Sequence, residues 1–168
     1  LAEIVEEPKT KEMLDSIFTR LSILLKELAQ MEQVTSQSFT LRKKKIRLQE
    51  LVDEASDLLF LDEPVSTNIT DETLDADFAT MSIVFKNLID NALKYATNLY
   101  IEYTPEGIVF SSKGKPLKRD LAYYTQAFSK EDDMNGDKGF GLGLYIVHEI
   151  LSKHQMKLSY TQENGLNK

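Results

Sequence analysis

Apolar residues recur with helical spacing in the first part of the chain. Steps of three and four alternate through Leu14, Ile17, Leu21, Leu24, Leu28 and Met31. This alternation is typical of the seam of a coiled coil. One helix cannot bury such a seam alone, so we expect a partner helix from outside this sequence or from a second copy. The alternative is that the helix folds back onto the globular part of its own chain.

After the polar residues 35–40, short strand patterns mix with helical ones. Alternating or β-branched segments predict strands over 44–48, 65–70, 98–104, 107–112 and 157–165. Apolar periodicity predicts helices over 48–61, 75–96 and 144–153. We expect Asp75 to cap the longest of these helices, and the last strand to enter a hairpin whose partner strand is absent. The order predicts an α/β (α+β) two-layer sandwich, with helices covering one face of a mixed sheet.

Composition narrows the possible functions. The 168 residues carry a formal net charge of −7, which argues against a protein built to grip nucleic acid. The lack of cysteine excludes disulfides, thiolate metal sites and cysteine nucleophiles. No apolar run approaches the roughly 20 residues that span a bilayer. We expect both ends to be cut, because the chain begins with Leu1 and stops just after a turn at Asn164 and Gly165.

The helix predicted over 75–96 carries the segment NLIDNALKY. Asn87, Asn91 and Lys94 share one face of it, and Tyr95 follows. An asparagine offers a neutral oxygen of the hard kind that Mg²⁺ prefers, and a lysine can meet phosphate. A solvated helix face is the alternative.

The segment GFGLGLYIV places three glycines before an apolar run, at Gly139, Gly141 and Gly143. Glycines here would let the backbone come close to a ligand before the chain turns into a helix. The N-terminus of that helix would favour an anion through its free N–H groups and its dipole. The alternative is a flexible surface loop ahead of a core helix.

Taken together and in this order, the two segments resemble the nucleotide-binding domain of sensor histidine kinases. That domain belongs to a wider family shared with gyrase-type, heat-shock-type and mismatch-repair ATPases. The resemblance covers residues 39–168, and residues 1–38 resemble the second helix of the kinases' dimerisation and phosphotransfer hairpin. It implies ATP and Mg²⁺ as ligands, a homodimer formed through the hairpin and a cognate response regulator. It also implies a cytoplasmic location, with any membrane attachment in a missing N-terminal region.

The resemblance implies a role for each matching residue. Asn87 and Asn91 would hold Mg²⁺, and Asn87 and Lys94 would be the catalytic residues. The nucleotide-binding set would be Asn91, Tyr95, Ser112, Gly114, Phe128, Lys130, Gly139, Phe140, Gly141, Leu142, Gly143 and Leu144. Phe128 would anchor a lid over ATP, with ordinary core packing as the alternative.

The sequence departs from the family pattern at two places. Ser112 and Pro116 stand where the first glycine box usually has its adenine-binding aspartate and its second glycine. The phospho-acceptor histidine is also missing, and we expect His148 and His154 to be structural or surface residues. Two other functions therefore stay open: a degenerate nucleotide-sensing or docking module, and an ATPase of the wider family. Asn87 argues against the ATPase, because those hydrolases have a glutamate base at this position.

Overall fold

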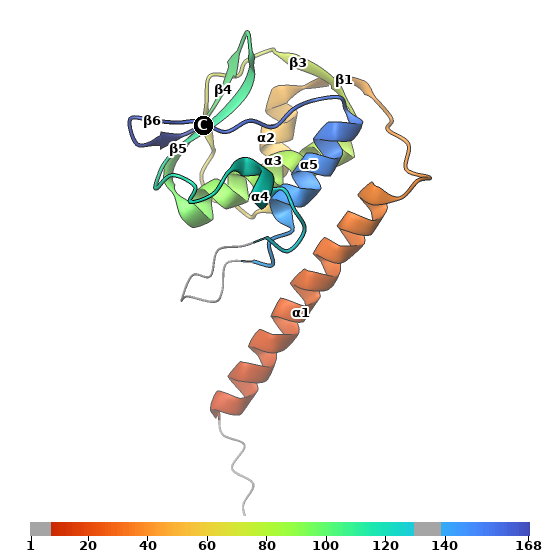
Figure 1. Cartoon of the computed structure of the whole chain (residues 1–168), viewed down its shortest axis with the longest axis vertical. Coiled ribbons are helices and arrows are strands. Elements are labelled where there is room, and N and C mark those ends of the chain that lie inside the picture. Colours follow the sequence, from red (N-terminus) through yellow and green to blue (C-terminus); the bar gives the residue numbers. More distant parts are fainter. Residues whose placement is uncertain (1–7, 130–138) are drawn as a thin grey trace, which may run out of the picture.

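The computed structural model describes residues 8–129 and 139–168, and shows a long helix attached to an α/β domain (Figure 1). The elements in chain order are α1 (Pro8–Thr35), β1 (Lys44–Arg47), α2 (Leu48–Leu58), β2 (Ser66–Thr67), β3 (Thr73–Ala76), α3 (Phe78–Tyr95), β4 (Thr97–Thr104), β5 (Gly107–Lys113), α4 (Leu121–Tyr124), α5 (Gly143–Lys153), β6 (Gln162–Glu163) and β7 (Leu166–Asn167). None of the helices within the described ranges is both long and apolar enough to cross a membrane.

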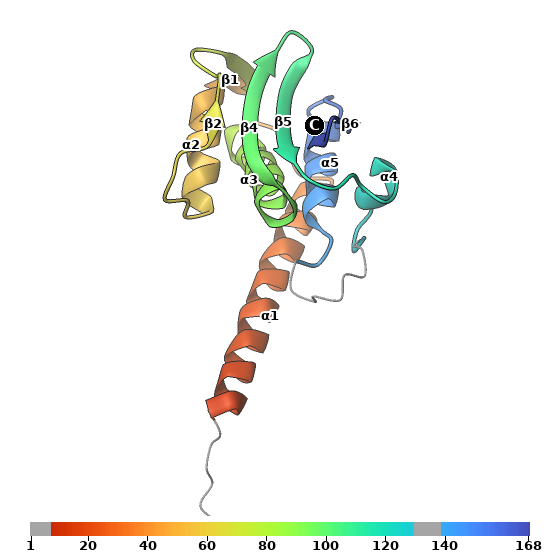
Figure 2. The ribbon, with the colours of Figure 1, turned by 90° about the vertical axis from the view of Figure 1, so that its left-hand side faces the viewer.

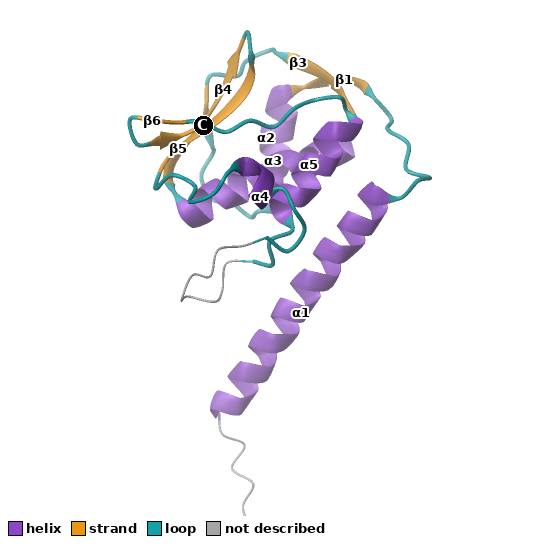
Figure 3. Ribbon diagram, in the orientation of Figure 1, coloured by secondary structure: helices purple, strands orange, loops and turns teal. Residues whose placement is uncertain are grey.

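The main sheet has five strands in the order β2-β4-β5-β7-β6. Strand β2 runs parallel to β4, and the other neighbours are antiparallel. Helices α2, α3 and α5 lie on one side of β4 and β5, and Figure 2 shows α3 directly behind these strands. Phe85 of α3 meets Phe110 of β5 edge to face, with ring centroids 5.2 Å apart. The predicted two-layer fold with a mixed sheet is confirmed, and Figure 3 separates its helices from its strands.

Helix α3 begins almost directly after strand β3 ends. The prediction that Asp75 caps it was wrong, because Asp75 lies within β3 and pairs with Lys45 of β1. Asp77 is the cap instead, and its carboxylate accepts a hydrogen bond of 3.0 Å from the Thr80 N–H. The strand pattern continues to Ala76, so the helix can begin only beyond it.

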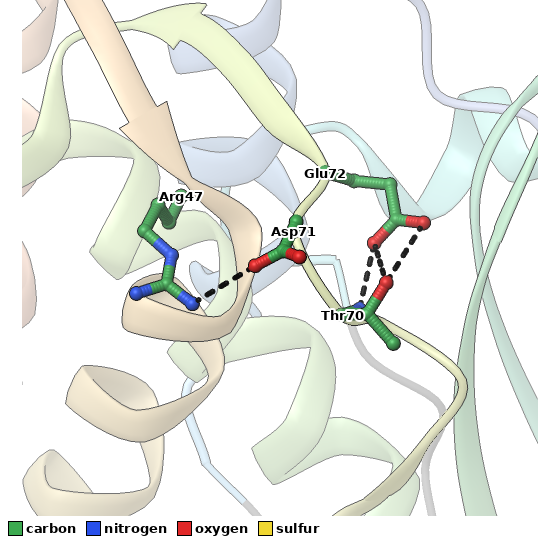
Figure 4. A network of polar contacts seen from close by, with 4 residues as sticks. All are labelled: Arg47, Thr70, Asp71 and Glu72. Carbon is green, nitrogen blue, oxygen red and sulfur yellow. Dashed lines mark hydrogen bonds and ion pairs between the residues drawn. The ribbon is translucent and has the colours of Figure 1, made fainter.

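A separate ribbon of β1 and β3 precedes α3, in which buried Ile46 pairs with Leu74. Polar contacts hold the turn that enters this ribbon (Figure 4). The Glu72 carboxylate accepts a 2.7 Å hydrogen bond from the Thr70 N–H, and hydrogen bonds from the Thr70 and Glu72 N–H groups lower the pKa of Glu72. An ion pair also joins Arg47 to Asp71, with Nη2 3.5 Å from Oδ1.

The C-terminal hairpin is more complete than the sequence suggested. Strand β6 pairs with β7, and β7 pairs with β5, so the prediction of an absent partner strand was wrong. Both strands of the hairpin have only two residues each, and the turn at Asn164 and Gly165 joins them. Strands this short carry no period-2 pattern that a sequence could reveal.

Helix α1 has two different surroundings along its length. Its C-terminal half contacts α5, where Leu24, Leu28 and Met31 pack against the core and Val34 is fully buried. The N-terminal half leaves the domain, and Leu14, Ile17 and Leu21 stay exposed there. The helix therefore folds back onto its own chain over one half of the seam and leaves the other half without cover from the described residues.

Candidate functional site

A cavity of about 1520 Å³ lies between α3, the end of β5, the glycine segment and the C-terminal hairpin. The predicted site residues that line it are Asn87, Asn91, Lys94, Tyr95, Ser112, Gly114, Gly139, Phe140, Gly141, Gly143 and Leu144. The fold thus gathers residues that are far apart in the sequence around one space. Ligand pockets commonly measure about 300–1,000 Å³, so the cavity has room for a nucleotide.

Two predicted site residues lie elsewhere, and a third lies outside the described part of the chain. The Leu142 side chain is fully buried in the core, and its carbonyl oxygen accepts the first hydrogen bond of α5, from the Ile146 N–H. Phe128 is exposed, has a φ of 61° and does not line the cavity. Lys130 lies outside the residues that the structure describes.

Asn87, Asn91 and Lys94 of helix α3 line the cavity and form what we call its polar stripe. Asn87 is the most deeply buried of the three. The Asn87 side chain is only 6% exposed, and its Oδ1 accepts a 3.3 Å hydrogen bond from Lys86. Its Nδ2 is buried and has no hydrogen-bond partner among the described residues. Lys94 lies nearer the surface, where its ammonium group is 2.6 Å from Asp90. The stripe therefore combines amide groups and a cation, which together suit a metal ion and a phosphate.

The glycine segment needs its glycines for two separate reasons. Gly139 and Gly141 have φ values of +98° and +75°, a region that side chains disfavour. A Cβ atom at Gly141 would also lie 2.4 Å from the Ser129 carbonyl oxygen. At Gly143 a Cβ atom would lie 3.9 Å from Asn87, so the segment passes close over the deep end of the stripe.

Helix α5 begins at Gly143, one residue before the predicted Leu144. Its first intrahelical hydrogen bond comes from the Ile146 N–H, so the earlier N–H groups have no acceptor within the helix. No side chain of the described residues caps this end. The free N–H groups and the helix dipole favour an anion in the cavity at this point.

The opposite end of the cavity is formed by β5, the loop after it and the C-terminal hairpin. Ser112 is buried there and pairs in register with Asn167 of β7. The Tyr160 hydroxyl accepts a 3.1 Å hydrogen bond from the Leu117 N–H and donates one of 2.8 Å to Asn167 Oδ1. Asn167 Nδ2 in turn donates to the Lys115 carbonyl oxygen at 3.1 Å. The hairpin therefore fixes the loop that lines this end.

Sequence reasoning missed Tyr160 and Asn167, which form this circuit. The prediction was one strand over 157–165 without a partner, which includes Tyr160 but ends before Asn167, so no pairing with β5 could be drawn. Their only sequence signal is the turn at Asn164 and Gly165, which predicts a hairpin but not where the hairpin docks.

Glu27 of α1 also lines the cavity and was not predicted. It lies on the same side of the helix as Leu24 and Leu28, which anchor α1 to the domain. Burial raises the pKa of the Glu27 carboxyl group, an effect that the ammonium groups of Lys86 and Lys94 oppose. Glu27 Oε2 is buried and makes no hydrogen bond within residues 8–129 and 139–168.

The two histidines lie apart from the cavity, as expected for structural or surface residues. His154 is 3% exposed; its Nε2 accepts from the Asp77 N–H at 3.1 Å, and its Nδ1 lies 2.8 Å from the Ile150 carbonyl oxygen. This arrangement requires the tautomer with the proton on Nδ1. His148 lies on the exposed side of α5, with Nδ1 3.5 Å from Glu149.

The chain is similar to one family of ATPases and to several sensor histidine kinases. Residues 76–167 match the family described as histidine kinase-, DNA gyrase B-, and HSP90-like ATPase. The sensor histidine kinase ArsS of Helicobacter pylori is 32% identical over 98% of the chain, and the sensor histidine protein kinase HK06 of Streptococcus pneumoniae is 30% identical over 69%. The chain spans 40% of the first relative and 29% of the second. In fold, it resembles the histidine kinase AdeS of Acinetobacter baumannii with a TM-score of 0.65 and 21% identity, over 96% of this chain and 81% of that one.

Proposed function

The chain belongs to the family of histidine kinase-, DNA gyrase B- and HSP90-like ATPases, and from this premise we propose that its cavity binds the magnesium complex of ATP for transfer of the γ-phosphoryl group to a histidine. The observation that supports the proposal most strongly is that the N-terminus of α5 lies close to the polar stripe of α3. Gly143 lies close enough to Asn87 that one anion could meet both.

Each residue of the cavity would bind the part of magnesium-ATP that suits its chemistry. Asn87 and Asn91 would hold Mg²⁺ through their amide oxygens, and the ion would neutralise charge on the triphosphate. Lys94 would keep its ion pair with Asp90 and direct a second N–H of its ammonium group to a phosphate oxygen. The N–H groups at the start of α5 would bind the remaining phosphate oxygens, which the glycines leave open to approach. Ser112, at the far end, would accept from the adenine amino group, and Phe128 and Lys130 would belong to the lid.

The proposal extends to the longer protein in which this domain works. Residues 39–168 would be the ATP-binding catalytic domain, and residues 1–38 would be the second helix of a dimerisation and phosphotransfer hairpin. The acceptor histidine would come from the other helix of that hairpin. From there the phosphoryl group would pass to an aspartate of a response regulator. We place this assembly in the cytoplasm, with any membrane attachment outside these residues.

A degenerate nucleotide-sensing module is the second candidate function, and Ser112 is the observation that favours it. A serine hydroxyl replaces the charged acceptor that the family usually offers to adenine, and hydrogen bonds to charged groups are roughly twice as strong. Such a module would bind nucleotide weakly and transfer no phosphoryl group. An ATP hydrolase is disfavoured because Asn87 cannot act as a general base.

Titration of the chain with ATP, in the presence of Mg²⁺ and in the presence of a chelator, tests the proposal. We expect binding to require the divalent ion, and Asn91→Ala to remove most of that dependence. Gln33→Ala removes an exposed amide from α1 and serves as the control. Equal affinity in Mg²⁺ and in chelator would rule out the assigned metal site.

A further inference from the structure

The predicted Mg²⁺ ligands of the cavity do not include a carboxylate. We call the part of the cavity around these ligands the metal corner. Asn87 and Asn91 are neutral, and the nearby Asp90 already pairs with Lys94 at 2.6 Å. Mg²⁺ is usually held by one or two carboxylates in addition to phosphates and water. No group of three or more His, Cys, Asp or Glu side chains in the described parts of the chain could hold a metal ion. A carboxylate from another element would complete the site.

Glu27 of α1 is the carboxylate that the fold brings to this corner. It lines the cavity together with Asn87, Asn91 and Lys94. Its position is fixed, because Leu24 and Leu28 pack against the core on either side of it. Lys86, Lys94 and Asp90 are near enough to act on its charge. Since these three residues belong to α3, the Glu27 carboxylate faces the polar stripe of that helix.

Two buried polar atoms of residues that line this cavity lack hydrogen-bond partners within the described residues, and one is an acceptor while the other is a donor. Glu27 Oε2 is an acceptor without a donor, and Asn87 Nδ2 is a donor without an acceptor. Buried polar groups without a partner are rare in native proteins, and such a group can mark the place where an ion binds. A hydrated cation with its phosphates would satisfy both atoms. The cation or one of its waters would meet the carboxylate, and a phosphate oxygen would accept from the amide.

We propose that Glu27 contributes its carboxylate to the Mg²⁺ site of the nucleotide cavity, either directly or through a water that the ion keeps. The inference rests on the proposed function, because it assumes that magnesium-ATP occupies the cavity. The inference has a structural consequence. Glu27 belongs to α1 and the rest of the site to the domain, so the bound metal–nucleotide complex stabilises the packing of the long helix on the domain.

The charge of Glu27 gives this role a distinct thermodynamic signature. A carboxylate beside a triphosphate attracts the cation but repels the nucleotide itself. Glu27→Gln should therefore weaken binding of ATP with Mg²⁺, by the roughly 10–100-fold that loss of a supporting metal-site group typically costs. In chelator the same variant should bind ATP no more weakly than the natural chain. A merely structural contact would change both affinities alike.

The experiment is a calorimetric titration of ATP into the natural chain, Glu27→Gln and Glu32→Gln, each with Mg²⁺ and with chelator. Glu32 is exposed on the same helix, so its replacement controls for loss of one negative charge. Thermal unfolding of the three chains checks that Glu27→Gln is folded. We expect it to be at least as stable, because the substitution removes a partly buried carboxylate whose Oε2 has no partner among the described residues.

Each outcome decides the question. A selective loss of magnesium-dependent affinity in Glu27→Gln supports the inference. Unchanged or tighter binding with Mg²⁺ overturns it while leaving the proposed function intact. Failure of the natural chain to bind magnesium-ATP overturns the proposed function, and the inference with it.

Hydrogen exchange along α1 tests the structural consequence. Magnesium-ATP should slow amide exchange over residues 24–31 of the natural chain and of Glu32→Gln, but not of Glu27→Gln. Exchange that is the same with and without nucleotide in the natural chain would overturn the stabilised packing of α1.

Discussion

Asp77 is the residue at which three segments of the domain meet. Its carboxylate caps α3 through Thr80 and accepts a 2.8 Å hydrogen bond from the Arg42 N–H. Its own N–H donates to His154 at the end of α5. Asp77 therefore ties the chain that follows α1, the start of α3 and the end of α5 into one buried network.

The first prediction concerns the stability that Asp77 contributes. Asp77→Ala should lower the free energy of unfolding by at least about 0.5–2 kcal/mol, the usual value of a helix cap, because the Arg42 N–H also loses its acceptor. Asp77→Asn keeps an oxygen for the cap and should cost less. Urea denaturation of the three chains at neutral pH measures the difference. Equal losses in both variants would show that the cap oxygen is not what matters.

The same network sets a pH dependence. Burial tends to raise the pKa of Asp77, but hydrogen bonds from Thr80 and Arg42 outweigh it, so that the pKa lies below its usual value. The unfolded chain thus binds a proton more readily at this group than the folded chain does. Its stabilisation is complete above the ordinary aspartate pKa and disappears as the pH falls through the lowered one. Asp77→Asn should lack this part of the acid destabilisation.

The second prediction addresses the base end of the cavity. Ser112→Asp should raise affinity for adenine over guanine nucleotides by about fivefold, because a charged acceptor binds the adenine amino group about 1 kcal/mol more strongly. Ser111→Asp is the control, since neighbouring side chains of a strand point to opposite faces. The ratio of the two affinities, measured by titration, decides. A ratio that does not move would place Ser112 away from the base.

At the level of elements, the sequence predicts single helices and the glycine segment. It does not predict which elements far apart in the sequence contact each other. Helix α3 is evident from its periodicity, and the glycine segment from its spacing before α5. By contrast, Glu27 is one charged residue among many on α1, and only the docking of Leu24 and Leu28 turns it toward the cavity. Asn167 matters because β7 pairs with β5, a contact between segments that are separate in the sequence.

The third prediction separates two kinds of glycine in the same segment. Gly141→Ala forces a side chain into a left-handed backbone, which costs about 1–2 kcal/mol, and into the Ser129 carbonyl oxygen. Gly143→Ala meets only an ordinary contact with Asn87 and lies in a helix, where alanine is favoured. We expect both to weaken nucleotide binding about tenfold, ~1.4 kcal/mol, because the added methyl group keeps phosphate from the backbone. Only Gly141→Ala should also lower stability.

Thermal unfolding without ligand and ATP titration with Mg²⁺ give the two measurements for the glycine variants. Gly165→Ala is the control for backbone strain alone, because its φ is +80°, no atom lies within 4 Å of the added Cβ, and Gly165 does not line the cavity. Unaltered nucleotide affinity in Gly143→Ala would contradict a phosphate site at the start of α5.

For the whole molecule, the long helix has one half of its seam packed on the domain and the other half exposed. Leu24, Leu28 and Met31 belong to the domain, whereas Leu14, Ile17 and Leu21 remain exposed. The fold-back alternative is confirmed for the C-terminal half of the helix, and a partner helix stays a prediction for the exposed half. We expect the exposed half to meet the partner helix of a dimerisation hairpin, and the docked half carries Glu27 to the cavity. Helix α1 is the element through which the partner helix and the nucleotide could affect each other.

The last prediction is that the chain alone binds ATP but does not phosphorylate itself. Phosphoryl transfer requires an acceptor nitrogen in line with the γ-phosphate. His154 is buried with both ring nitrogens engaged, and neither it nor His148 lines the cavity. Incubation with labelled ATP should therefore leave no acid-labile phosphate on the chain, and the chain should dimerise poorly because half of its seam lacks a partner among the described residues. A chain extended upstream by an acceptor helix should become labelled and dimeric. Stoichiometric labelling of His148 or His154 in the isolated chain would show that the phosphotransfer site lies within the domain itself.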